Sequence, residues 1–158
     1  MAEITNLNPT IIKPSDVFGY ELNTDVGYAR ETFNITGATV AKPVRVGTVL
    51  VVDYATMTAT PADGATVTAT SELGVFVGHD LPTNPATYYD FANLVMVADG
   101  DGVLIVKGDG RGILKRGYLD FAGKQYYSLT EQQRKTIDTA FTTLNRFKMV
   151  DQQYTPAV

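Results

Sequence analysis

Acidic and glycine residues gather in the segment from residue 99 to residue 112. Asp99-Gly-Asp-Gly102 and Gly108-Asp-Gly-Arg-Gly112 bring three aspartates together, and clustered carboxylates are the ligands that calcium prefers. An EF-hand loop beginning at Asp99 would, however, place Val103 and Gly110 at positions that need oxygen-bearing side chains. Asp-Gly pairs also supply the positive φ angles of tight hairpins. We therefore interpret 99–102 as a hairpin turn, with calcium binding as the minor alternative, and we expect no metal and no cofactor.

The residues that nucleophilic catalysis requires are sparse. The sequence has no cysteine and one histidine, His79, which is followed by Asp80 and preceded by Ser71. No Gly-x-Ser-x-Gly turn surrounds a serine, and the glycine-rich segment lacks the strand-to-helix position of a phosphate-binding loop. We therefore expect a protein that is not an enzyme and has no catalytic residues.

Composition and charge narrow the classes of partner. The 158 residues carry 13 basic and 17 acidic side chains, a net charge of −4, which is the wrong sign for binding a phosphate backbone. No run of about 18 apolar residues is long enough to cross a bilayer, and the first residues lack the basic and apolar regions of a signal peptide. We expect neither a nucleic-acid nor a membrane partner, and synthesis in a cytoplasm.

Basic side chains concentrate at Lys107, Arg111, Lys115 and Arg116. Edge strands often carry lysine and arginine, because these charges discourage pairing with other chains. A solvated strand face is therefore the preferred interpretation, and contact with an acidic partner is the alternative.

Residues 1–25 show neither a two-residue nor a 3.6-residue apolar period, and they include Pro9, Pro14 and Gly19. We interpret them as an extended arm that precedes a β domain over 26–150 and a polar tail over 151–158. The arm is too apolar for an inert tail, so it either packs along its own domain or adds a strand to the sheet of a partner. The candidate partner-binding residues of the arm are Ile11, Ile12, Pro14, Val17, Phe18 and Tyr20.

Short segments rich in β-branched and aromatic residues predict β-strands along most of the chain. Gly47 marks a bulge or bend within one of them. Asp99–Gly102 separates two others as a hairpin. The predicted strands are 28–36, 44–54, 56–60, 66–70, 73–78, 92–97, 103–107, 113–121 and 147–150.

One helix interrupts this β pattern near the C-terminal end. Ser128-Leu-Thr-Glu131 fits a capping box, in which Ser128 is the N-cap and Glu131 reaches back to it. The helix is predicted to run to about Arg146, and its apolar face predicts that it covers a sheet. That face consists of Leu129, Ile137, Ala140, Phe141, Leu144 and Phe147. The predicted class is α+β and mainly β, with a small antiparallel β domain, one C-terminal helix and an extended N-terminal arm.

The order of four segments resembles a known family. They are Tyr28-Ala-Arg-Glu-Thr-Phe-Asn-Ile35, Val46-Gly-Thr-Val-Leu50, Leu73-Gly-Val-Phe-Val77 and Val103-Leu-Ile-Val-Lys-Gly108. Together with the late helix, this order resembles the lambda-type bacteriophage head decoration proteins over about residues 28–150. The resemblance implies a β-tulip or barrel-like domain.

The resemblance also implies a structural role. Such proteins bind the outer surface of the expanded phage capsid as homotrimers at three-fold and quasi-three-fold sites, contact the major capsid protein through the N-terminal arm and stabilise the head against internal DNA pressure. The expected location is therefore the outside of the virion, after synthesis in the cytoplasm of the host bacterium. The alternatives are another virion component, such as a head fibre base or a tail-associated domain, and a small ligand-binding β module that uses 99–112.

Overall fold

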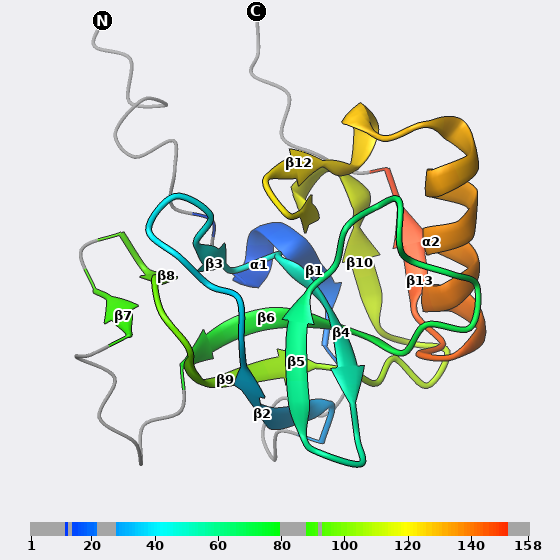
Figure 1. Cartoon of the computed structure of the whole chain (residues 1–158). Coiled ribbons are helices and arrows are strands. Elements are labelled where there is room, and N and C mark those ends of the chain that lie inside the picture. Colours follow the sequence, from blue (N-terminus) through cyan, green and yellow to red (C-terminus); the bar gives the residue numbers. More distant parts are fainter. Residues whose placement is uncertain (1–11, 13, 22–27, 80–87, 92, 152–158) are drawn as a thin grey trace, which may run out of the picture.

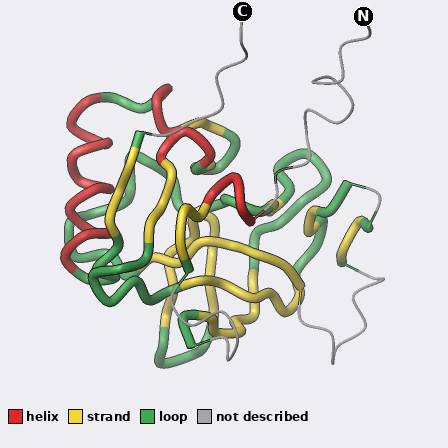
Figure 2. Tube along the Cα trace, turned by 180° about the vertical axis from the view of Figure 1, so that it is seen from behind, coloured by secondary structure: helices red, strands yellow, loops and turns green. Residues whose placement is uncertain are grey.

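The computed structural model describes residues 12, 14–21, 28–79, 88–91 and 93–151, and within them the fold is mainly β with one long helix near the C-terminal end (Figure 1). This confirms the predicted fold class. The helix and the sheet that contains β7 (Tyr89–Asp90) and β8 (Val95–Met96) lie on opposite sides of a central group of strands, as both views of the chain show (Figures 1 and 2).

The central strands close into a barrel in the order β2-β5-β4-β6-β9. Neighbouring strands run antiparallel, except that β2 and β5 are parallel. The barrel strands are β2 (Arg30–Ile35), β4 (Val49–Asp53), β5 (Thr58–Pro61), β6 (Leu73–His79) and β9 (Gly100–Ile105).

Alternating side chains of the barrel strands belong to two separate buried clusters. One cluster has members from all five strands and fills the barrel, and it includes Ile35, Leu50 and Phe76. Adjacent residues such as Val49 and Val75 belong to the second cluster, which also holds the buried face of the long helix. The two-residue period of a strand therefore supplies both the barrel interior and the layer outside it.

The predicted hairpin turn at Asp99–Gly102 is wrong, because Gly100–Ile105 is strand β9 and pairs with β2 and β6. Neither Gly100 nor Gly102 has a positive φ angle. These glycines instead provide room: a Cβ at Gly102 would lie 2.3 Å from Cδ1 of Ile35, and one at Gly100 would lie 2.4 Å from the Tyr88 ring. Close packing of side chains against the backbone, not turn geometry, explains the glycines here.

Two smaller sheets and a hairpin surround the barrel. β10 is the central strand of one sheet and pairs antiparallel with β1 and parallel with β13, while the other sheet has the order β3-β8-β7. β11 and β12 form the hairpin. The bounds are β1 (Phe18–Tyr20), β3 (Val44–Arg45), β7 (Tyr89–Asp90), β8 (Val95–Met96), β10 (Ile113–Lys115), β11 (Asp120–Phe121), β12 (Lys124–Gln125) and β13 (Lys148–Val150).

The N-cap of the long helix, α2 (Glu131–Thr143), lies two residues later than predicted. Thr130 is the N-cap and forms a capping box with Gln133, whereas Ser128 ends a 3-10 helix over Tyr126–Ser128. Two capping-box patterns overlap here, Ser-x-x-Glu and Thr-x-x-Gln, and the second forms. Leu129, which lies between the two possible caps, is buried in the core. The helix also ends before Arg146, and Leu144 of the predicted apolar face remains 44% exposed.

The predicted strand 66–70 is also wrong, since this segment forms turns. The amides of Thr66 and Val67 donate to the carbonyl of Asp63, and the Thr68 amide donates to Oγ of Ser71. Local bonds of this kind compete with strand pairing. Similarly, a 3-10 helix over Arg116–Tyr118 divides the predicted strand 113–121 into β10 and β11.

The described part of the arm packs on its own domain. Pro14–Val17 form a short helix, α1, rather than extended backbone, and β1 follows it and pairs with β10. Val17 is fully buried in the cluster beneath α2. Residues 1–11, 13 and 22–27 of the arm, and residues 152–158 of the predicted tail, lie outside the described residues. Residues 14–21 of the arm are thus part of the packed fold.

We predict that Val17→Ala lowers the free energy of unfolding by about 2 kcal/mol, because it removes buried methyl groups and leaves a cavity. Tyr20→Ala, in the same arm but with a residue that is 49% exposed, should change it by less than about 0.5 kcal/mol. Urea denaturation of both variants measures the difference. Equal stability of the Val17 variant and the parent chain would show that the arm is not part of the cooperative fold.

Candidate functional site

The structure brings part of the predicted arm site together. Pro14, Phe18 and Tyr20 line a shallow groove of about 310 Å³. Pro14 and Tyr20 are exposed there, whereas Val17 and Phe18 are buried in the chain's own core. Ile12 is partly buried against the same core, and Ile11 lies outside the described residues. Pro14 and Tyr20 are therefore the exposed members among those predicted arm residues that the structure describes.

Two polar contacts hold this arm in place. Nζ of Lys115 donates to the carbonyl oxygen of Ser15 at 3.1 Å. The Arg30 guanidinium binds both carboxylate oxygens of Glu21, at 2.6 and 2.8 Å. Paired contacts of arginine with a carboxylate fix geometry as well as charge. The arm is therefore tied to the domain within α1, at Ser15, and directly after β1, at Glu21.

The other sequence candidates are dispersed or engaged within the chain. The Asp99 carboxylate accepts from the Gly37 amide at 3.0 Å, and Asp101 accepts from the side-chain amide of Asn34 at 3.3 Å. No three His, Asp or Glu side chains gather as metal ligands among the described residues. His79 packs against the rings of Tyr89 and Phe91, and Asp80 lies outside the described residues.

Two of the basic residues between 107 and 116, Lys107 and Arg116, contact different parts of the chain. Nζ of Lys107 lies 5.0 Å from the centre of the Tyr28 ring. Arg116 pairs with Asp138 at 3.1 Å and with Asp151 at 3.2 Å. Burial and the hydrogen bond to Asp151 raise the pKa of Tyr127 to about 12. The contacts of Arg116 join α2 to Asp151, the residue after β13.

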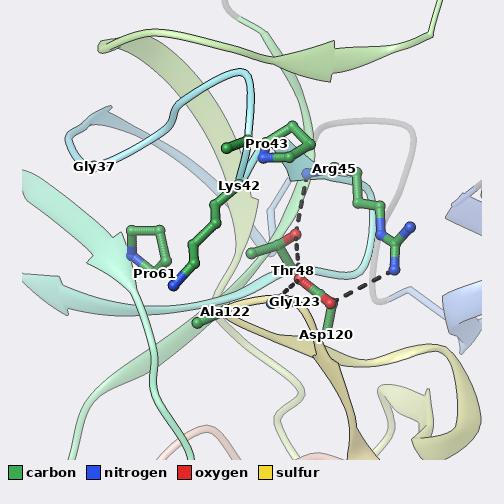
Figure 3. A pocket seen from close by; sticks show the side chains of 10 residues that line it. Gly37, Lys42, Pro43, Arg45, Thr48, Pro61, Asp120, Ala122 and Gly123 are labelled. Atoms are coloured by element: carbon green, nitrogen blue, oxygen red, sulfur yellow. Dashed lines mark hydrogen bonds and ion pairs between the residues drawn. The ribbon is translucent and has the colours of Figure 1, made fainter.

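A pocket that the sequence analysis did not identify lies between the barrel and the β11–β12 hairpin. Its volume is about 200 Å³. Pro43 and Pro61 form apolar walls, and the side chains of Lys42, Arg45 and Asp120 supply charge (Figure 3). It is a concave site with few polar groups, as small-ligand sites commonly are.

Gly47 brings the polar residues of this pocket together. Its φ angle is +97°, and a Cβ there would lie 2.5 Å from the carbonyl oxygen of Tyr118. This close approach lets the Asp120 amide donate to the Gly47 carbonyl at 3.0 Å and aligns Thr48 with Asp120. Glycine is required at this position because a side chain would separate the two segments.

Asp120 is the buried charge of the pocket, with 4% of its surface exposed. Oδ2 accepts from the Thr48 hydroxyl and the Gly123 amide, both at 3.4 Å. Oδ1 lies 3.5 Å from Nη2 of Arg45, an ion pair too long for a good hydrogen bond, and accepts no hydrogen bond from the described residues. Burial raises the pKa of Asp120, against the opposing effects of Arg45, Gly123 and Thr48.

A sequence signal for this site exists in the run Leu119-Asp120-Phe121. Both neighbours are large apolar residues, and both are almost fully buried. A carboxylate between two core residues is uncommon, because burial of an unpaired charge is costly. The pairing partners Arg45 and Thr48 are more than 70 residues away, which is why residue spacing did not identify the site.

Comparison with known proteins adds no assignment: no protein-family model and no curated protein matches the chain. Among the described residues, no helix is both long and apolar enough to cross a membrane.

The buried carboxylate predicts a specific dependence of stability on pH. Because the pKa of Asp120 is higher in the folded chain than its ordinary value of about 3.9, the folded protein binds more protons between these two values, and the free energy of unfolding falls as pH rises. Asp120→Asn removes the titrating carboxyl and with it this fall. The free energy of unfolding of the variant minus that of the parent chain should therefore rise with pH, by up to about 1.4 kcal/mol per pH unit. Urea denaturation from pH 4 upward measures this difference. A difference that does not change with pH would contradict the assignment.

Proposed function

We propose that this protein is a structural virion protein that binds the outer surface of an expanded bacteriophage capsid as a homotrimer and stabilises the head. Its partner is the major capsid protein, at three-fold and quasi-three-fold sites, and it acts without catalysis. The observation that supports this proposal is the placement of the four segments that resemble head decoration proteins.

These four segments are not scattered over the fold. They include all of β2 and parts of β4, β6 and β9, which are barrel strands. β2 pairs with β9, β9 with β6, and β6 with β4. The resemblance therefore covers one continuous sheet with its own buried interior, which is the part of a small domain that defines its fold.

The shallow groove lined by Pro14, Phe18 and Tyr20, the arm groove, is the proposed contact surface for such a partner. Val17 and Phe18 are buried and hold the arm on the domain. Pro14 and Tyr20 line the same groove. Among the described strands β1 is an edge strand, since β10 is the one strand of these that pairs with it. An exposed strand edge with an aromatic side chain suits the addition of a partner strand.

Cosedimentation with expanded empty heads of the cognate phage tests this proposal. The full chain should bind saturably, and Tyr20→Ala should weaken binding about tenfold or more, since a central aromatic contact contributes above about 1.4 kcal/mol. Tyr54→Ala, which alters another exposed tyrosine on the turn between β4 and β5, should leave binding unchanged.

A chain without residues 1–11 completes the experiment, because this deletion retains α1 and β1. Loss of binding in this chain together with intact binding of the Tyr20 variant would place the contact on 1–11. Failure of the full chain to bind heads would contradict the proposal and favour the alternative of a tail-associated or head fibre protein.

A further inference from the structure

Within the described part of the chain, the pocket beside Asp120 has one buried polar atom without a hydrogen-bond partner and one exposed lysine without an ion pair. Oδ1 of Asp120 is buried and accepts no hydrogen bond there. The Lys42 side chain also lines the pocket, and none of the described ion pairs includes its ammonium group. A buried acceptor without a donor costs free energy, so a ligand that supplies one would stabilise the site.

The charged groups lie on different sides of the pocket. Figure 3 shows the Lys42 ammonium beside Pro61 and the Arg45 guanidinium on the other side of Asp120. Two cations and one carboxylate give the pocket a net positive charge when Asp120 is ionised. An anionic group is therefore favoured, and Lys42 is its available partner.

The group that meets Asp120 must be a hydrogen-bond donor without a positive charge. Nη2 of Arg45 already lies 3.5 Å from Oδ1, so a second cation would be repelled by the guanidinium. An amide N–H satisfies Oδ1 without this repulsion. The walls contributed by Pro43, Pro61 and Ala122 suit a small apolar side chain.

We infer that this pocket binds an N-acyl amino acid, whose carboxylate pairs with Lys42 and whose amide N–H donates to Oδ1 of Asp120. A volume of about 200 Å³ accommodates a single residue of this type. The same chemical group ends every peptide chain, so the ligand is either a free acylated amino acid or the carboxyl end of a peptide. This site is separate from the arm groove and does not depend on capsid binding.

Titration with N-acetyl-L-alanine, followed by amide shifts in two-dimensional NMR, tests the inference on the full chain. Saturable shifts of the Thr48 and Gly123 amides are expected. Propionate lacks the N–H donor and N-acetyl-L-alaninamide lacks the carboxylate, so each should bind about tenfold more weakly, the effect of one lost charge-assisted hydrogen bond. Ala-Ala-Ala, added in a separate titration, distinguishes the two sources: tighter binding than N-acetyl-L-alanine indicates a peptide end, and equal or weaker binding indicates the free acid.

Two substitutions separate this site from a general effect on the fold. Lys42→Gln should weaken the binding of N-acetyl-L-alanine about tenfold, while Lys148→Gln, an exposed lysine on β13, should have no effect. Absence of saturable shifts at Thr48 and Gly123 would overturn the inference. Equal binding of N-acetyl-L-alanine, propionate and N-acetyl-L-alaninamide, or equal binding by the Lys42 and Lys148 variants, would also overturn it.

Discussion

The close approach of side chains to the backbone at Gly102 is the constraint on which the barrel depends. Gly102 lies in β9 and faces Ile35 of β2, Phe76 of β6 and Met96 of β8, which leave no room for a Cβ at this residue. Closure of a five-stranded barrel leaves a narrow interior, and a strand without a side chain at one point allows large residues from its neighbours to fill it. The same contact brings Met96, and with it the β3-β8-β7 sheet, against the barrel.

A second close approach, at Gly47, connects the barrel to the rest of the molecule. It places the segment before β4 against the Tyr118 carbonyl, with Val17 of the arm in contact with the same point. The buried Asn145 side chain adds a further link, because its amide donates to the carbonyls of Leu73 and Val106 at 2.8 and 2.7 Å. Arm, barrel and helix therefore stabilise one another, and a partner meets only what this packing leaves exposed.

The sequence predicts the class of the fold and most strand positions because apolar alternation reflects burial directly. It fails where one residue type serves two purposes. The Asp-Gly pattern predicts turn glycines at Gly100 and Gly102, although close packing requires them. The predicted capping box at Ser128 is overlapped by the one that forms at Thr130. The Asp120 pocket could not be predicted, because Arg45 and Thr48 reach it only through the contact of distant segments. The sequence indicates which arm residues are apolar enough to dock. Which of them are buried and which are exposed depends on the pairing of β1 with β10.

The most direct test of the proposed role is a cryo-electron microscopy reconstruction of expanded empty heads of the cognate phage incubated with the full chain. The account predicts additional density outside the shell, grouped in threes at the three-fold and quasi-three-fold positions, into which the barrel and α2 fit with the arm groove facing the shell. Heads that show no additional density, or density at other positions, would contradict it.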